Sequence, residues 1–263
     1  MRTYLAGQIL FWEGGSLWIG RSNGTTSTHV HHAIQIGVAL DGTFRLKTPE
    51  DPDWRAYTGA IIPSHQPHTY STVESVVALI FVEPESHEGQ ILLQRYGGGG
   101  VATIPEAVTQ DAAALLGPAY FEERGEEKLV GAAHEVIRLL TAGARPRVVV
   151  DDRILQAISL VKERIAGPVL QDEIAEAVFL SPSRFRHLFV EETGMAFRPY
   201  VLWLRLHRAL ECLTAGESLT NAAHASGFSD LAHFSRTFRR MFGIAPTMLE
   251  QPDSYAPTVS RSE

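Results

Sequence analysis

Three histidines stand in a pattern that could bind a metal ion or a small molecule. His29 and His31 are two residues apart, and His68 follows in a later segment. Residues two apart in a β-strand point to the same face, so His29 and His31 are expected to enter one interior. With His68 from a separate strand, they would supply three imidazole nitrogens, a set that suits Zn, Fe, Ni or Cu.

A second group of residues could bind nucleic acid. The net charge of −7 argues against a generally basic nucleic-acid binder, because such proteins carry an excess of Lys and Arg against phosphate. Any DNA contact must therefore come from local clustering. Acidic residues gather at Glu122–Glu127, whereas arginines populate the last third of the chain: Arg184, Arg186, Arg198, Arg205, Arg208, Arg236, Arg239 and Arg240.

These arginines accompany two copies of a helix-turn-helix pattern, in which a short helix and a tight turn precede a helix whose apolar residues pack back on the first. The first copy comprises Ile174-Ala175, Leu180-Ser181 and then Phe185, Leu188 and Phe189. The second comprises Ala222-Ala223, Gly227-Phe228 and then Phe234, Thr237 and Phe238. Two copies make a chance occurrence much rarer.

The second copy resembles the C-terminal signature of the AraC/XylS family. The residues that carry this resemblance are Gly227-Phe228-Ser229-Asp230, His233-Phe234-Ser235-Arg236, Phe238-Arg239, Phe242-Gly243 and Pro246. The stretch from Thr193 to Ala209 resembles the long helix that joins the two units of that family. The resemblance covers residues 151–250 and implies double-stranded DNA as a partner. It also implies a small-molecule effector, a homodimer and transcriptional activation, with RNA polymerase as a further candidate partner.

The register of the apolar residues selects the candidate DNA contacts. The outward-facing set is Ser183, Arg184, Arg186 and His187 in the first unit, and Leu231, Ala232, His233, Arg236, Arg239 and Arg240 in the second. We expect Arg186 and Arg236 to read bases, because arginine can bind the O6 and N7 atoms of guanine together. Arg184, Arg239 and Arg240 are expected to contact phosphates, although exposed arginines are also commonly just solvated.

The histidine region is similar to the two signature motifs of cupin barrels, in which three histidines and a carboxylate hold a divalent metal. The matching residues are Gly24, His29, His31, Gln35 and Gly42, and later Gly59, Pro63 and His68. Gln35 replaces the usual glutamate, and His65 stands where glycine is more common. We therefore predict an effector site at His29, His31, Gln35 and His68, assign no cofactor and do not favour a divalent metal. Structural or surface histidines remain the third reading, and strand parity predicts that His32 points outward.

Four aromatic residues are a further choice between pocket and packing. Trp12, Trp18, Trp54 and Tyr57 could line a ligand pocket, because ligand sites commonly combine aromatic side chains with a few polar groups. Packing in the core or at its rim is the preferred interpretation.

Short apolar runs separated by turn residues predict β-strands in the N-terminal part. They are Ser16–Ile19, Ile34–Leu40, Thr43–Leu46, Ala60–Ile62 and Ser75–Val82, with Asp41-Gly42 as a hairpin turn and Gly97–Gly100 as a loop leaving the β domain. Helices are predicted at Asp151–Ile165, Gln171–Val178, Pro182–Glu192, Arg198–Thr214, Thr220–Ala225 and Asp230–Phe242, followed by a frayed tail beyond Gln251.

One further helix has two open roles. Leu129, Ala133, Val136, Ile137 and Leu140 recur at three- and four-residue intervals and share a helix face. This face could contact a second subunit, or it could pack against the β-barrel of its own chain. Gly143 is expected to end the helix.

Composition limits the class of protein. The 263 residues are 44% hydrophobic and 20% charged, which is ordinary for a folded soluble chain. The single Cys212 excludes an intramolecular disulfide and fits a reducing compartment. The sequence shows neither a signal peptide nor an apolar stretch of membrane-spanning length, so we expect a cytoplasmic protein without a membrane partner.

These observations predict an α+β two-domain protein. We expect a cupin-like, effector-binding β-barrel in residues 1–104, a helical dimerisation or linker region in 105–150, and an all-α DNA-binding domain with two helix-turn-helix units in 151–250. The predicted function is sequence-specific, effector-responsive transcriptional regulation, not enzymatic catalysis. One alternative is a metal-dependent cupin enzyme fused to a DNA-binding module, and another is a ligand-independent DNA-binding protein controlled by its abundance.

Overall fold

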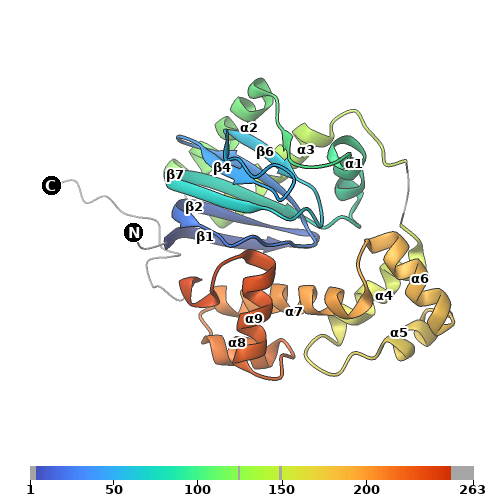
Figure 1. Ribbon diagram of the computed structural model, residues 1–263. Coiled ribbons are helices and arrows are strands. Elements are labelled where there is room, and N and C mark those ends of the chain that lie inside the picture. Colours follow the sequence, from blue (N-terminus) through green and yellow to red (C-terminus); the bar gives the residue numbers. More distant parts are fainter. Residues whose placement is uncertain (1–3, 124, 148–149, 250–263) are drawn as a thin grey trace.

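An antiparallel sheet forms the N-terminal half of the chain in the computed structural model, which describes residues 4–123, 125–147 and 150–249 (Figure 1). Its strands are β1 (Tyr4–Trp12), β2 (Gly15–Thr25), β3 (Ile34–Ala39), β4 (Phe44–Lys47), β5 (Arg55–Tyr57), β6 (Gly59–Ile62), β7 (Thr69–Val82) and β8 (Ala102–Thr103). The main path through the sheet runs β1-β2-β7-β3-β6-β8, and β4 joins β5 to β7. The long β7 strand thus pairs with β2, β3 and β4.

Strand β3 is buried on both faces, and its alternating side chains explain why. Ile34, Ile36 and Val38 pack in a core that also contains residues of the helices after the sheet. Gln35 points the other way and lines a cavity. Alternate residues of a strand face opposite sides of the sheet. One face of β3 therefore packs against the helices, and its other face lines the cavity.

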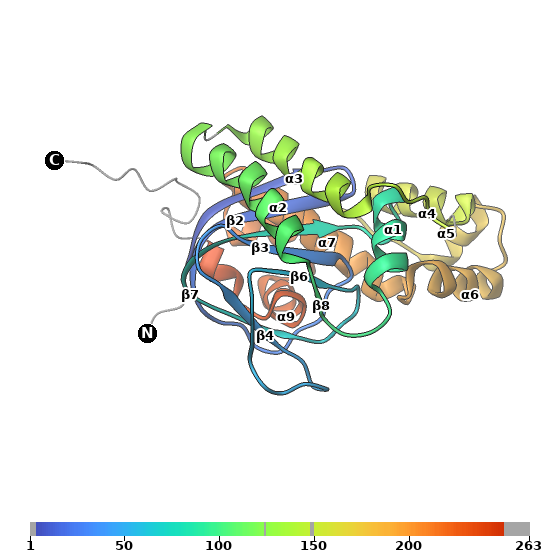
Figure 2. The same cartoon turned by 90° about the horizontal axis from the view of Figure 1, so that it is seen from above.

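Helices cover one face of the sheet (Figure 2). They are α1 (His87–Tyr96), α2 (Glu106–Pro118), the π-helical turn η1 (Ala119–Glu123) and α3 (Glu126–Thr141). The apolar face of α3, including Leu129, Val136 and Leu140, lies in the same core as Ile36 and is buried. This face therefore packs against the sheet of its own chain, which was one of the two roles considered for it.

The C-terminal half is helical. It contains α4 (Asp152–Glu163), α5 (Gln171–Ala177), α6 (Pro182–Thr193), α7 (Phe197–Thr214), α8 (Leu219–Ala225), α9 (Leu231–Phe242) and the 3-10 turn η2 (Pro246–Leu249). These helices match those predicted from sequence to within a few residues. Ser181 caps α6, because its hydroxyl accepts a hydrogen bond from the Arg184 backbone N–H, and Pro182 occupies the first helical position as expected.

Several predictions in the N-terminal half need correction. The five predicted strands exist within β2, β3, β4, β6 and β7, but β1, β5, β8, α1 and α2 were missed. Asp41-Gly42 does not close a hairpin, because β3 and β4 each pair with β7 instead of with each other. The Asp41 carboxylate instead accepts a hydrogen bond from the Val76 N–H at 2.5 Å. The loop at Gly97–Gly100 does not leave the β domain, since β8 follows it and pairs with β6. The tail beyond Gln251 lies outside the described residues.

The two halves share a hydrophobic core. Trp18 and Phe81 of the sheet pack with Trp203 of α7 and Phe242 of α9, and the Trp18 and Phe242 rings stack with their centroids 5.0 Å apart. Lys162 of α4 also pairs with Glu83 at 3.2 Å. Among the described residues, no helix is both long and apolar enough to cross a membrane.

Candidate DNA-binding surface and effector cavity

The first helix-turn-helix unit consists of α5, the turn at Phe179 and α6. Ile174 and Ala175 of α5 are buried in one core with Phe185 and Phe189 of α6. The apolar spacing of α6 thus directs the opposite helix face to solvent. That exposed face carries all four predicted first-unit contacts: Ser183, Arg184, Arg186 and His187.

The second unit consists of α8, a turn at Gly227 and α9. Phe234 and Phe238 are completely buried, whereas the following predicted contacts are exposed: Leu231, Ala232, Arg236, Arg239 and Arg240. His233 differs from them because it is half-buried, packs edge-on against Phe228 and lies 3.3 Å from the Ser229 hydroxyl. The His233 side chain is thus partly engaged within the protein, and its contact with DNA stays a prediction.

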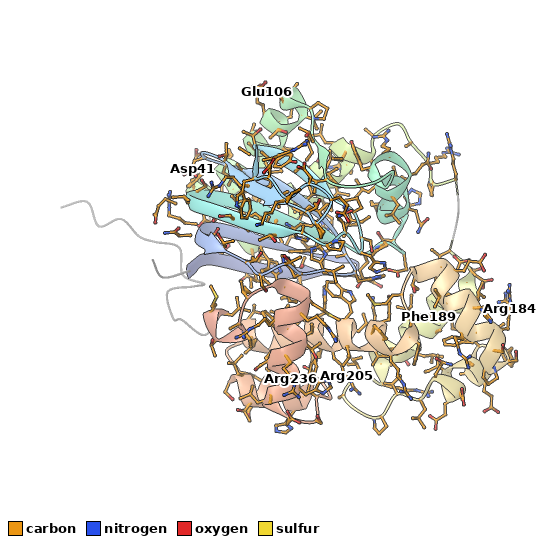
Figure 3. The ribbon with its side chains drawn as sticks, in the orientation of Figure 1. Asp41, Glu106, Arg184, Phe189, Arg205 and Arg236 are labelled. Carbon is orange, nitrogen blue, oxygen red and sulfur yellow. The ribbon has the colours of Figure 1, made fainter. Side chains whose placement is uncertain are left out.

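Arg205 and Gly227 connect the second helix-turn-helix unit to the loop that precedes the first. Arg205 of α7 donates hydrogen bonds to the carbonyl oxygens of Ile165 and Gly167, at 3.3 and 2.8 Å. Gly227, with φ of +78°, comes so close that an added Cβ would lie 2.6 Å from the Ile165 oxygen. Figure 3 labels Arg184 and Arg236 on the two recognition helices and Arg205 on the helix that joins them. The structural role of Arg205 was missed, because its partners are backbone atoms far away in the sequence.

A cavity lies inside the curved sheet and reaches the helical half. Its residues from the sheet domain include His29, His31, Gln35 and Trp18, and its residues from the helical half are Phe242, Ile244 and Met248. Its volume is about 90 Å³. The two predicted motifs therefore meet: the end of the second recognition helix is one wall of the predicted effector site.

The structure brings His29, His31 and His68 together, all of them buried. One ring nitrogen of each lies within 4.8 Å of the others. In every case Nδ1 lies near a backbone carbonyl oxygen: 2.9 Å from that of Ser27 for His29, 2.8 Å from that of Ala33 for His31 and 2.9 Å from that of Gln66 for His68. A carbonyl oxygen only accepts, so in His29 and His68 Nδ1 carries the proton and Nε2 is left as the acceptor.

Burial keeps these rings uncharged. It lowers the pKa of His29 to about 3, and the neighbouring His31 lowers it further. Burial likewise lowers the pKa of His31 to about 4, against the opposing effect of its hydrogen bond with Gln35. The pKa of His68 is also held well below its usual range by burial, with His29 and His31 adding to the effect. Near neutral pH each ring therefore has one donor and one acceptor nitrogen.

The ring orientations of His29, His31 and His68 fit a divalent transition metal, but the surroundings of His31 do not. Metal-binding histidines commonly donate their other ring N–H to a carbonyl, as His29 and His68 do. However, the Gln35 side-chain amide lies 2.9 Å from His31 Nε2. The atom that faces His31 Nε2 is the amide oxygen Oε1, so the Gln35 side chain occupies the position that a metal on this nitrogen would need. A metal would have to displace Gln35, and the set offers no anionic ligand in its place.

His32 contradicts its prediction as a surface residue, because its side chain is completely buried. Its Nε2 lies 2.7 Å from the Glu85 carboxylate and its Nδ1 lies 2.9 Å from His65 Nε2. Its ring also packs edge-on against Tyr200 of α7, with the centroids 4.9 Å apart. His32 thus belongs to the contact between the two halves.

The four aromatic candidates, Trp12, Trp18, Trp54 and Tyr57, have different surroundings in the structure. Trp18 lines the cavity, contrary to the preferred packing interpretation. Trp12 packs on His134, and Tyr57 stacks on Phe44. Trp54 is exposed beneath the cationic groups of Arg45 and Lys47. Packing at the rim or core is therefore correct for Trp12 and Tyr57, while Trp54 lies at the surface.

The fold and this exposed surface define a class: a DNA-binding protein with a tandem helix-turn-helix domain attached to a sheet domain. A family model described as a helix-turn-helix domain matches residues 174–251. The transcriptional regulator ArgR of Pseudomonas aeruginosa is 31% identical over 130 residues, which are 45% of this chain and 40% of ArgR. The activator RhaR of Pectobacterium atrosepticum is 25% identical over 210 residues, 72% of this chain and 73% of RhaR.

The C-terminal part of the chain is thus a helix-turn-helix domain of the AraC type, as its motifs indicated, and the chain is similar to regulators of the AraC/XylS family. The crystal structure of ToxT from Vibrio cholerae O395 has the same two-domain fold, with a TM-score of 0.59 and 14% sequence identity over 90% of this chain and 99% of ToxT. The chain spans less than half the length of the first curated relatives that it matches.

Proposed function

We propose that the protein is a sequence-specific transcriptional regulator that responds to a small-molecule effector. The observation that carries the proposal is the cavity wall at Phe242, Ile244 and Met248, which places the end of recognition helix α9 against the predicted effector site. An occupant of this cavity that contacts both halves would favour one arrangement of the two domains over another. Such a difference in affinity is what an effector needs in order to shift a population.

The DNA-binding part of this proposal rests on the two exposed helix faces. Arg186 of α6 and Arg236 of α9 are exposed and have no side-chain hydrogen bond to another described residue. They are therefore available to read guanine edges, while Arg184, Arg239 and Arg240 are available for phosphates. Direct readout by Leu231 and Ala232 is limited to apolar contact, for example with thymine methyl groups.

Selection of binding sequences from a random duplex pool tests this function directly. We expect the full chain to enrich a motif, and its affinity for that motif to fall steeply with salt because phosphate contacts release counterions. Equal affinity for the selected and the starting pools at fixed salt would contradict sequence-specific regulation. The same duplex then serves to test effectors.

An organic effector and activation of transcription are supported by named relatives. Solved structures of ToxT are described as bound to an unsaturated fatty acid and to (E)-4-(8-methylnaphthalen-1-yl)but-3-enoic acid. RhrA of Rhizobium meliloti and RhaS of Citrobacter koseri are named activators. We extend to this chain only the small organic ligand and the activating direction. A reporter gene behind the selected motif tests the direction, and pull-down of RNA polymerase tests that partner.

The homodimer also remains a proposal, together with the division into residues 1–104, 105–150 and 151–250. Its interface would have to differ from the α3 face with Leu129 and Leu140, which is buried within the chain. Analytical ultracentrifugation with and without the selected DNA would determine the oligomeric state.

The histidine cluster keeps a second candidate function open, a metal-dependent cupin enzyme. His29, His31 and His68 would hold the ion, and a metal there could act as a Lewis acid on a small substrate. Elemental mass spectrometry of protein purified without an affinity tag, compared with His31→Ala, tests this function. Less than a tenth of an equivalent of metal in the wild type would reject it.

A further inference from the structure

The cavity has walls from both halves of the chain. Trp18 of β2 and Phe242 of α9 both line it, and their rings stack with centroids 5.0 Å apart. Ile244 and Met248 extend the wall beyond the end of α9. A molecule in this cavity would therefore contact the sheet and the second helix-turn-helix unit at once.

The size and lining of the cavity restrict the body of a ligand. At about 90 Å³ the cavity is smaller than the apolar cavity of roughly 150 Å³ that can hold benzene. Large apolar side chains dominate its walls: Trp18, Val77, Leu79, Phe81, Phe242, Ile244 and Met248. The enclosed part of the cavity is thus smaller than one benzene ring needs, so a ring-sized apolar group would extend towards the opening.

The polar end of the cavity restricts the head of the ligand. His29 lines the cavity, whereas His68, whose ring centroid lies 4.2 Å from that of His29, is not part of the lining. The hydrogen bonds of His29 to described residues involve Nδ1, which leaves its Nε2 available. This Nε2 atom is an acceptor because Nδ1 donates to the Ser27 carbonyl. A ligand that donates a hydrogen bond to His29 Nε2 therefore gains affinity.

The same end offers little to an anion. None of the described residues that line the cavity is Lys or Arg. A buried carboxylate therefore finds no opposite charge, and the acceptor nitrogen of His29 would repel its oxygens. His31 cannot help, because one ring nitrogen faces the Ala33 carbonyl and the other is bonded to Gln35.

We propose that the cavity binds a small, uncharged, mainly apolar molecule whose head donates a hydrogen bond to His29, and which contacts Phe242 across the domain boundary. This inference rests on the proposed function, since it names the chemical class of the effector. It disfavours a buried carboxylate and a metal as the resident occupant.

Two matched pairs of probes test the head group on the full-length wild-type protein, after treatment with a chelator. Phenol and toluene have similar shapes, but only phenol donates a hydrogen bond. Benzamide and benzoate are also similar in shape, but only benzoate is charged. In ligand-observed NMR titrations at neutral pH, we expect phenol to bind about tenfold more tightly than toluene, and benzamide about tenfold more tightly than benzoate.

Two variants test the assigned contacts. His29→Leu should abolish the preference for phenol over toluene by replacing the acceptor with an apolar side chain. Phe242→Ala should weaken phenol and toluene alike by about fivefold or more, because it removes the wall from the helical half. Phe179→Ala removes a phenylalanine that is 92% exposed and lies outside the cavity, so it should leave both affinities unchanged.

The outcomes separate this inference from the proposed function. Tighter binding of benzoate, equal affinities within both pairs, or no saturable binding of phenol would each overturn the ligand class. Near one equivalent of metal that is lost in His29→Leu would overturn it as well. Failure to select a DNA motif would instead overturn the regulator, whatever the probes do.

Discussion

Ser27 holds Gly243 through two hydrogen bonds. The Ser27 backbone N–H and hydroxyl both donate to the Gly243 carbonyl oxygen, at 2.9 and 3.1 Å. The Ser27 carbonyl in turn accepts a hydrogen bond from His29 Nδ1 at 2.9 Å. Since Gly243 ends α9 and His29 lines the cavity, one serine connects the second recognition helix to the predicted effector site.

Substituting Gly243 should loosen this connection. Gly243 has φ of +70°, and an added Cβ would lie 2.6 Å from the Ser27 oxygen and 2.7 Å from His29 Nδ1. We expect Gly243→Ala to reduce the free energy of unfolding by about 2–3 kcal/mol, from backbone strain together with the clash. Chemical denaturation would measure the loss, and limited proteolysis would show whether the two halves separate more readily.

Gly216→Ala is the matched control. Gly216 also has a positive φ, +91°, but an added Cβ would meet nothing within 4 Å. It should therefore lose only the backbone contribution, about 1 kcal/mol. Equal losses in the two variants would show that the contact between Gly243 and Ser27 contributes no stability.

The helix-turn-helix units could be predicted from sequence because their information is local. Phe234 and Phe238 are four residues apart, and so are Phe185 and Phe189, which places each pair on one helix face. Their burial leaves the intervening arginines exposed without any knowledge of the rest of the fold. Strand runs such as Ile34–Ala39 were predictable for a similar reason, since a continuous apolar run is typical of a strand buried on both faces.

The contacts between the halves could not be predicted in this way. Strand parity placed His31 inward and His32 outward, but His31 and His32 lie in an irregular segment before β3, where alternation does not apply. His29 pairs with His68 only as an isolated bridge. Both His31 and His32 are therefore buried, facing the cavity and α7 respectively. The burial of such residues depends on which helix packs against them. The spacing of residues in the sequence does not predict that helix.

Base readout and phosphate contact should differ in two arginine variants. Arg186→Ala should weaken binding to the selected motif by about 10- to 100-fold, yet change non-specific binding little, because a bidentate contact with guanine discriminates by about 1–3 kcal/mol. Arg239→Ala should weaken both kinds of binding to a similar extent and reduce the salt dependence. Mobility-shift titrations at fixed salt would measure both. If Arg186→Ala lowers both affinities equally, Arg186 contacts phosphate instead of a base.

A carboxylate at position 35 should create the metal site that the native residue disfavours. Gln35 Oε1 lies 2.9 Å from His31 Nε2, so Gln35→Glu would put an anionic oxygen beside His31 in place of the neutral amide oxygen. We expect affinity for Zn²⁺ to rise about tenfold or more, measured by elemental mass spectrometry after equilibrium dialysis. Gln35→Met is the control, since it removes the amide without adding charge. Similar zinc content in both variants would show that the missing carboxylate is not what limits metal binding.

The last prediction concerns pH and the contact between β1 and α7. His207 packs against Trp203 with ring centroids 4.3 Å apart and meets Phe11 of β1 at 6.2 Å. Burial lowers the pKa of His207 to about 4, although nearby Glu83 opposes the effect and Lys162 adds to it. The unfolded chain, with an ordinary histidine pKa near 6.5, therefore binds this proton more readily than the folded one. Neutral His207 contributes stability that is complete above about pH 6.5 and is lost progressively as the pH falls towards 4.

His207→Phe should keep the apolar packing and remove this titration. Between pH 6 and pH 4.5, roughly the window of the shift, we expect the free energy of unfolding of the wild type to fall more steeply, by about 1.4 kcal/mol per pH unit. The other buried histidines titrate in both proteins, so the difference in slope isolates His207. Urea denaturation at several pH values would provide the slopes. Parallel slopes would mean that His207 is as easily protonated in the folded chain as in the unfolded one, and that the contact with Phe11 and Trp203 does not exclude water from its ring.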